Sequence, residues 1–178
     1  MVGGLKTKSV PMYSLKSIEH SLLTEDDLRL IIKIKSKAWN YSFEQQRSWI
    51  MNHISDNDIH LILYRENDPV AYMNLVNVNA EINQASVLCW GIGNVCSIAP
   101  GRGYGKELMI SGNKYIEESG KPGLLFCKEN LVPFYSRYGW QILSKSTLDL
   151  NFDNATVNVM VYNYNDCIDK LIYNDKNF

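Results

Sequence analysis

One segment near the middle of the chain constrains its fold more than any other, the glycine loop Pro100-Gly101-Arg102-Gly103-Tyr104-Gly105-Lys106. An extended apolar stretch over residues 85–98 precedes this loop, and apolar residues at helical spacing follow it over residues 104–118. A strand therefore leads into a helix through a turn in which every second residue is glycine. Glycines keep side chains away from a helix N-terminus, where free backbone N–H groups bind phosphates. The segment predicts a site for a phosphate-containing ligand.

Two common phosphate-binding patterns do not fit the glycine loop. The Walker A pattern, G-x-x-x-x-G-K-[ST], requires glycine where this chain has Pro100 and a hydroxyl residue where it has Glu107. The dinucleotide pattern, G-x-G-x-x-G, requires a different spacing from that of the glycines at 101, 103 and 105. An ATPase, a GTPase and a dinucleotide-binding enzyme are therefore disfavoured.

The rest of the chain alternates between strand and helix patterns. Thr24 followed by three acidic residues, and Ser42 with Gln45 three residues later, are signals for helix starts. We expect a loose segment over residues 1–11 and a single domain over 12–178. The expected strands cover residues 12–20, 59–64, 70–78, 85–98, 123–127, 141–148 and 156–162, with a loop over 79–84 and helices after Thr24 and Ser42, over 104–118, and from Asn130 to Gly139. The order β-α-α-β-β-β-α-β-α-β-β predicts an α/β fold with a central mixed sheet flanked by helices.

Composition narrows the class of protein. The 178 residues carry a formal net charge of −1, without the broad basic character of nucleic-acid binders. No apolar run reaches the roughly 18 residues that span a bilayer, and no signal peptide is apparent. The four cysteines show no metal-ligand spacing, and three of them lie in apolar segments, which predicts buried free thiols. We expect a cytoplasmic protein that binds no nucleic acid, membrane or metal.

A second segment supports an identification with a known superfamily. It runs from Leu124-Leu125-Phe126-Cys127 to Leu131-Val132-Pro133-Phe134-Tyr135-Ser136-Arg137-Tyr138-Gly139-Trp140. It resembles the GNAT acetyltransferase strand and helix that end in Y-x-x-x-G-[FW], and the glycine loop resembles the GNAT pattern [RQ]-x-x-G-x-[GA]. Pro100 departs from the first position of that pattern, and Arg102 is the substitute we expect for the missing charge. The two motifs occur in the family's order, within residues 94–140.

The resemblance implies a GNAT-like sheet that is splayed between strands 4 and 5, and acetyl-CoA as cosubstrate. Ile98 matches the usual backbone contact to pantetheine, and Gly91 and Gly93 favour a distortion of the same strand. The pyrophosphate would lie on Gly101, Arg102, Gly103, Tyr104, Gly105 and Lys106. Tyr135 matches the family tyrosine that commonly protonates the departing thiolate.

The acceptor amine is less constrained by the sequence. Trp39, Tyr41, Phe43 and Trp90 either line an acceptor pocket or fill the core. The general base stays open among Glu44, His60, Glu81 and a chain of waters. The leading hypothesis is an acetyl-CoA-dependent N-acetyltransferase that acts on a primary amine of a small molecule. The alternatives are a CoA-binding GNAT-fold sensor without turnover and, on a loose likeness of the carboxyl half, an aminoglycoside-type acetyltransferase. A homodimer, common in the superfamily, is left open.

Overall fold

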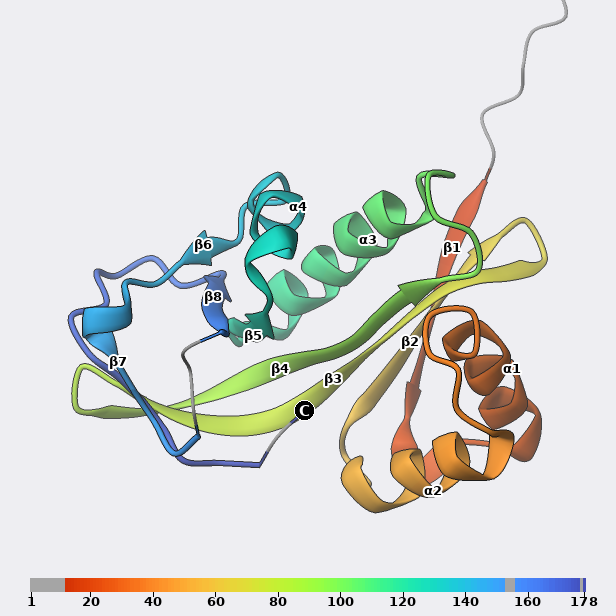
Figure 1. The fold of residues 1–178 in the computed structure, drawn as a ribbon, viewed down its shortest axis with the longest axis horizontal. Coiled ribbons are helices and arrows are strands. Elements are labelled where there is room, and N and C mark those ends of the chain that lie inside the picture. The colour runs from red at the N-terminus through yellow and green to blue at the C-terminus, as the bar shows by residue number, and fades with distance from the viewer. Residues whose placement is uncertain (1–11, 153–155, 177) are drawn as a thin grey trace, which may run out of the picture.

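A computed structural model of the protein describes residues 12–152, 156–176 and 178. Within these residues nine strands form one mixed sheet, in the order β1-β2-β3-β4-β5-β8-β6, with β9 on the far end of β3 and β7 on β9 (Figure 1). The predicted loose segment over residues 1–11 lies outside the described residues. The strands are β1 (Tyr13–Glu19), β2 (Ile59–Arg65), β3 (Asp68–Ile82), β4 (Ala85–Ser97), β5 (Gly123–Cys127), β6 (Gln141–Ile142), β7 (Leu148–Leu150), β8 (Asn158–Tyr162) and β9 (Leu171–Tyr173).

Helices cover both faces of this sheet, as predicted. Figure 1 shows α1 and α2 on one face and α3 and α4 on the other. Leu61 and Leu63 of β2 pack with Leu108 of α3, whereas Ile62 between them packs with Ile31 of α1, which is the alternation expected of a strand buried on both faces. The helices are α1 (Glu25–Lys35), α2 (Phe43–His53), α3 (Tyr104–Ser119) and α4 (Val132–Ser136), and short 3-10 turns cover His20–Leu22, Glu129–Leu131 and Lys145–Thr147.

The two predicted helix starts are confirmed. The Thr24 hydroxyl accepts a hydrogen bond from the backbone N–H of Asp27 at 3.1 Å. Ser42 and Gln45 form a reciprocal capping box, with distances of 3.2 Å and 2.9 Å between side chain and backbone. The Ser42 cap fixes the end of the segment between α1 and α2, and Trp39 and Tyr41 of that segment line a pocket described below.

The hairpin of β3 and β4 is longer than predicted. The expected loop over residues 79–84 is wrong, because the turn consists of Asn83 and Gln84 alone. Both turn residues have positive φ, 51° and 69°, as a two-residue turn that matches the twist of a hairpin requires. The overlooked signal is the alternation of apolar and polar residues over 78–82, which continues the strand.

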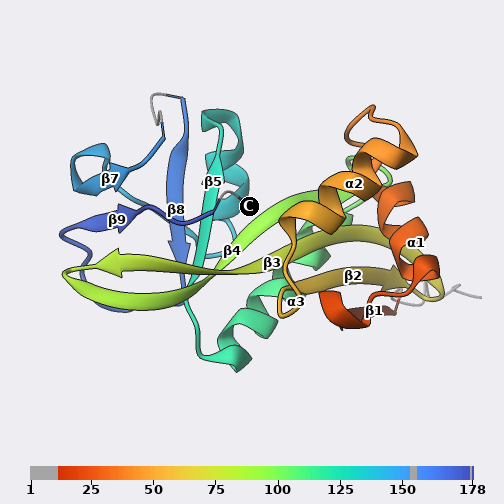
Figure 2. The ribbon, with the colours of Figure 1, turned by 90° about the horizontal axis from the view of Figure 1, so that it is seen from below.

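The edge of β4 that faces β5 is open over much of its length. The two strands run parallel and pair only at Trp90 with Gly123 and at Gly91 with Leu124, after which they diverge (Figure 2). β4 also contains a bulge, since its register with β3 shifts and Asn94 has φ of 53°. The expected splay and distortion are therefore both present, although the distorted residue is Asn94 and not a glycine.

The carboxyl half differs most from the prediction. The helix expected from Asn130 is only the short α4, because Asn130 belongs to the 3-10 turn that precedes it and Leu131 occupies the N-cap position. The strand expected over residues 141–148 is divided into β6 and β7 by the 3-10 turn Lys145–Thr147. The irregular tail contains β9, which the sequence analysis missed.

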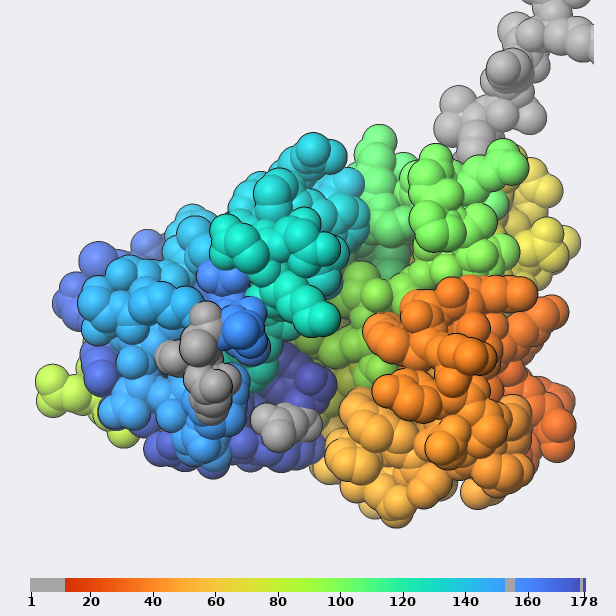
Figure 3. Space-filling view, in the orientation of Figure 1, coloured from red at the N-terminus to blue at the C-terminus, as the bar shows by residue number. Residues whose placement is uncertain are grey.

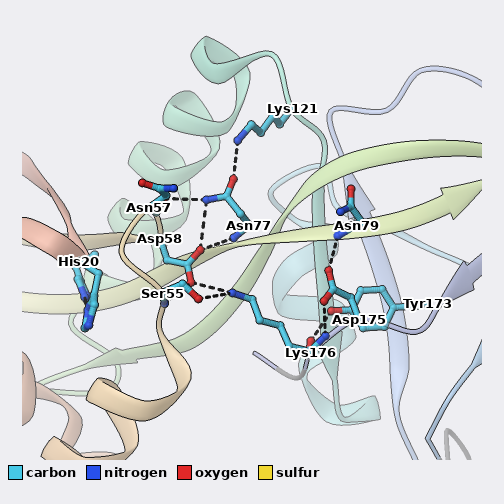
Figure 4. A network of polar contacts seen from close by, with 11 residues as sticks. His20, Ser55, Asn57, Asp58, Asn77, Asn79, Lys121, Tyr173, Asp175 and Lys176 are labelled. Carbon is cyan, nitrogen blue, oxygen red and sulfur yellow. Dashed lines mark hydrogen bonds and ion pairs between the residues drawn. The ribbon is translucent and has the colours of Figure 1, made fainter.

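A network of polar contacts holds the segment after β9 against the sheet (Figure 4). The side chain of Asp58 is only 1% exposed and accepts hydrogen bonds from the backbone N–H groups of Asn77 at 2.7 Å and Ser55 at 2.8 Å. The ammonium of Lys176 pairs with the same carboxylate at 3.1 Å. This buried charge is therefore fully partnered, and it ties the tail to the loop between α2 and β2.

Candidate functional site

A cleft of about 550 Å³ lies where β4 and β5 diverge. One wall is the end of β4 with the glycine loop, and the other is α4 with the turn before it. In the space-filling view the surface is hollowed between the teal α4 region and the green and orange segments (Figure 3). The lining residues are Val95, Cys96, Ser97, Ala99, Pro100, Gly101, Gly103, Tyr104, Gly105, Lys106, Leu131, Phe134, Tyr135, Arg137 and Tyr138.

The glycine loop leaves the N-terminus of α3 unobstructed. Gly101 and Gly103 have φ of 76° and 81°, and a Cβ at either position would meet nothing within 4 Å. Gly103 is the N-cap residue, so α3 starts without the side-chain cap that Thr24 and Ser42 provide for the first two helices. The uncapped backbone N–H groups and the positive end of the helix dipole suit an anion in this cleft.

Two cations accompany the loop, but they are not the pair expected from the sequence. Lys106 lines the cleft as predicted, whereas Arg102 is exposed and does not. Arg137, at the C-terminal end of α4, lines the opposite wall. Sequence reasoning missed this residue, although it lies inside the quoted tyrosine motif, three residues before Trp140.

The open backbone edge of β4 belongs to Ser97 and not to Ile98. The N–H of Ile98 donates to the carbonyl of Val70 on the β3 side at 2.9 Å, so its backbone groups face the sheet. In an antiparallel pair the neighbouring residue directs its N–H and C=O to the opposite edge. Ser97 therefore presents its backbone to the cleft, which it lines, whereas Ile98 lines a different depression beside Lys33 and Arg65.

The hydroxyl of Tyr135 is available in the cleft. α4 carries this side chain, which is 8% exposed and packs against Phe134 and Trp140. Among the described residues none forms a hydrogen bond with its hydroxyl. Burial, with a smaller contribution from the nearby Cys127, raises the pKa of Tyr135 to about 12. The phenol is therefore protonated at neutral pH and able to donate a proton.

A second pocket, of about 450 Å³, lies on the α1–α2 side of the sheet. Asn94, at the bulge of β4, lines this pocket, and the next residue, Val95, lines the cleft, so the bulge borders both hollows. We refer to this second pocket as the Lys35 pocket. Its lining residues are Lys35, Trp39, Tyr41, Gln45, Gln46, Trp49 and Asn94.

The Lys35 pocket contains two of the four aromatic residues singled out from the sequence, Trp39 and Tyr41. Phe43 is outside the lining, on the exposed side of α2 with the guanidinium of Arg29 at 5.7 Å from its ring centre. Trp90 is also outside it, buried against α3 with its indole N–H donated to Ser119 at 2.9 Å. Trp49 of α2 also lines the pocket, and it is not among those four residues.

The glycines of β4 make room for the last described residue. A Cβ on Gly91 would lie 2.6 Å from the ring of Phe178, and one on Gly93 would lie 3.0 Å from the backbone of Phe178 and 3.1 Å from the amide of Asn74. Phe178 also stacks on Phe126 of β5, with 4.8 Å between ring centres. These glycines therefore serve close packing between the diverging strands, and the bulge lies one residue further on.

Comparison with known proteins identifies the family. A model of the "Acetyltransferase (GNAT) domain" matches residues 19–143. The chain belongs to the GNAT acetyltransferase family. Among curated proteins, none matches the sequence.

Solved structures of GNAT proteins share this fold. Escherichia coli YhbS in complex with CoA is 11% identical, with a TM-score of 0.65 over 96% of this chain and 94% of its own. Escherichia coli ElaA is 18% identical, with a TM-score of 0.60 over 84% of this chain and 99% of its own. The ribosomal-protein-S18-alanine N-acetyltransferase of Escherichia coli is 13% identical, with a TM-score of 0.55 over 84% of this chain and 91% of its own. At these identities the likeness concerns the fold.

None of the three side chains considered as a general base lines the cleft. His60 is fully buried, with its two ring nitrogens 2.9 Å from His20 and 2.8 Å from the hydroxyl of Tyr72, and burial lowers its pKa to about 3. Glu44 is exposed in the first turn of α2, and Glu81 is exposed near the tip of the long hairpin. Neither cavity includes them.

Three further observations concern the cysteines, metal-binding side chains and the lengths of the helices. Cys89, Cys96 and Cys127 are buried free thiols, as predicted, and Cys167 is exposed. The part of the chain that the structure describes contains no group of three or more His, Cys, Asp or Glu side chains placed to hold a metal ion. No described helix is both long enough and apolar enough to cross a bilayer.

Proposed function

We propose that this GNAT protein is an acetyl-CoA-dependent N-acetyltransferase acting on a primary amine of a small molecule. One observation carries the proposal: a single cleft is lined by the uncapped N-terminus of α3, by the open edge of β4 and by the unbonded hydroxyl of Tyr135. These three features suit, in that order, a pyrophosphate, an amide-containing arm and a leaving thiolate. Their arrangement around one cleft matches the parts of one molecule, acetyl-CoA.

The residues at the mouth of the cleft suit the phosphates. The N–H groups of residues 103–106 would hold the pyrophosphate, as would the charges of Lys106 and Arg137. The backbone of Ser97 would pair with the pantetheine amides in the manner of an added strand. This assignment replaces Ile98, whose N–H is already bonded to β3.

The reaction would occur at the bulge of β4, which borders both the cleft and the Lys35 pocket. A neutral amine attacks the thioester carbonyl, the new C–N bond forms and the C–S bond breaks. Tyr135 would donate its phenolic proton to the departing sulfur, and the amine would lose a proton to solvent. Alignment of the reactants in the two adjoining cavities supplies much of the rate enhancement.

The test combines CoA binding with turnover. Calorimetry with CoA and release of the free thiol from acetyl-CoA are measured for the wild type and for Tyr135→Phe. We expect both proteins to bind CoA equally and the variant to lose about 100-fold in kcat, the lower end of the range for a general acid.

Three outcomes would contradict parts of the proposal. No CoA binding at millimolar ligand would exclude the family's cosubstrate. CoA binding without thiol release for any amine in a broad panel would favour a sensor. An unchanged kcat in Tyr135→Phe would remove the acid role alone.

A further inference from the structure

The Lys35 pocket is lined by two buried residues, each with a polar group that has no hydrogen-bond or ion-pair partner among the described residues. Lys35 is 4% exposed, and within the described part of the chain its ammonium has neither an ion pair nor a hydrogen bond. Gln46 is 3% exposed, and its carbonyl oxygen also lacks a partner there. Buried polar groups without partners are rare in native proteins, and each calls for an explanation.

The position of the Lys35 ammonium is fixed by aromatic side chains. Its nitrogen lies 4.4 Å from the ring centre of Trp49 and 5.9 Å from that of Trp39. Both distances are within the range of cation–π attraction, which orients the cation without neutralising it. Burial lowers the pKa of Lys35 to about 8, so the group still carries its charge at neutral pH.

The side chain of Gln46 is equally fixed. Its amide nitrogen donates to the hydroxyl of Ser36 at 2.9 Å and lies 3.4 Å from the carbonyl of Tyr41. The carbonyl oxygen of the same amide is left as a hydrogen-bond acceptor. The pocket thus combines a cation, an acceptor and aromatic walls, and none of its lining residues is an acid.

The single positive charge decides which acceptors suit the pocket. A polyamine or an aminoglycoside would bring further cations towards Lys35 and find no carboxylate among the lining residues. A monoanion would pair with the ammonium and offset the cost of its burial. No second cation lines the pocket to favour a doubly charged phosphate over a carboxylate.

We infer that the acceptor is an amine that also carries a carboxylate on an apolar or aromatic body, and that Lys35 binds this carboxylate. The inference rests on the proposed function, because it assigns the Lys35 pocket to the acceptor. The aromatic walls contact the body of the acceptor, and Gln46 accepts a hydrogen bond from it. The amine points to the bulge at Asn94, whose neighbour Val95 lines the cleft.

Paired ligands that differ only in the carboxylate test this inference. The pairs are 4-(aminomethyl)benzoate with benzylamine, and phenylalanine with phenethylamine. Binding is followed through the fluorescence of the pocket tryptophans, without CoA, and acetylation through thiol release. The proteins are the wild type, Lys35→Met and Lys35→Arg. The methionine keeps the unbranched chain up to the last atom and removes the charge, whereas the arginine keeps the charge but cannot act as a base.

We expect the wild type to prefer the carboxylate member of at least one pair by about tenfold or more, the size of one charge-assisted contact. Lys35→Met should lose this preference while still binding the amines that lack a carboxylate. It should also have a higher Tm than the wild type, because a buried charge is gone. Lys35→Arg should keep at least part of the preference.

The inference is overturned if the wild type favours the amines without a carboxylate in both pairs, or if Lys35→Met keeps the preference. It is also overturned if Lys35→Arg, which keeps the charge, shows no more preference for the carboxylate members than Lys35→Met does. Calorimetry with CoA on the same proteins separates the two proposals. Normal CoA binding without a carboxylate preference refutes only the acceptor class, whereas absent CoA binding refutes the proposed function.

Discussion

The two ends of α3 offer a matched pair of substitutions for the phosphate site. Gly103 precedes the helix and Gly120 follows it, with φ of 81° and 70°, and a Cβ at either position would meet nothing within 4 Å. Asparagine tolerates this left-handed conformation better than other non-glycine residues, and it is accepted at both ends of helices. Gly103→Asn and Gly120→Asn should therefore place similar, small demands on the fold.

Their effects on CoA binding should differ. Gly103 lines the cleft, so a side chain there occupies space in front of the uncapped N–H groups of α3, whereas Gly120 lies at the opposite end of the helix. Losing one charge-assisted hydrogen bond to a phosphate costs about 2 kcal/mol, which corresponds to roughly 30-fold in Kd. Backbone strain should cost about 1 kcal/mol or less in both variants and lower Tm by roughly 2–4 °C.

Calorimetry with CoA and thermal unfolding of both variants check this reasoning. The expected result is a similar small fall in Tm for both and a large rise in Kd for Gly103→Asn alone. Equal affinities in the two variants would refute the assignment of the phosphates to the glycine loop. A much larger fall in Tm for Gly103→Asn would show that the loop is more constrained than its open surroundings indicate.

Two further predictions concern charged side chains. Burial lowers the pKa of Lys35 to about 8, so its positive charge is present below that pH and is lost as the pH rises through it. The Kd for 4-(aminomethyl)benzoate, measured by tryptophan fluorescence, should therefore rise above pH 8 in the wild type but stay flat to pH 9.5 in Lys35→Arg. Tighter binding at high pH would contradict this. Lys176→Met should lower the free energy of unfolding by about 1–2 kcal/mol, because the buried Asp58 loses a partner, although the remaining backbone bonds and the partial exposure of Lys176 limit the loss. Lys170→Met, which removes an exposed ion pair with Asp149 at 3.7 Å, is the control and should change the free energy of unfolding little. Both variants are compared with the wild type by urea titration.

Local signals in the sequence predicted the elements that carry backbone chemistry. The caps at Thr24 and Ser42, the start of α3 after the glycine loop and the whole of β5 agree with the structure. Each depends on residues within a few positions along the chain. The same reasoning failed at the hairpin over residues 79–84, where a turn-forming composition concealed a continuing alternation.

The details of the site depend on contacts that the sequence does not display. The choice between Ile98 and Ser97 is a question of strand phase, and the bulge at Asn94 sets that phase through the pairing of β4 with β3. Arg137 acquires its position because α4 packs beside the cleft. A one-residue change in phase reverses which backbone groups face the ligand, so no local pattern could have decided it.

Lys35 is the clearest case of such dependence. In the sequence it is an ordinary lysine in the last turn of a helix, where a cation interacts favourably with the helix dipole and is usually solvated. Its burial arises from Trp39 in the following segment and Trp49 in the next helix, which close over it. Trp39 lies four residues after Lys35 but beyond the end of α1, and Trp49 lies in a separate helix, so the contact depends on how the two helices pack.

The treatment of buried charge elsewhere in the molecule indicates why Lys35 matters. Asp58 is as deeply buried, yet it receives two backbone N–H groups and the ammonium of Lys176. The fold is therefore able to satisfy a buried charge completely when the charge serves structure. Lys35 and the carbonyl of Gln46 lack hydrogen-bond and ion-pair partners among the described residues, and both line the same pocket. Local rules of stability tend to be broken at functional sites, so these two unsatisfied groups are better explained by a ligand that completes them than by a defect of packing.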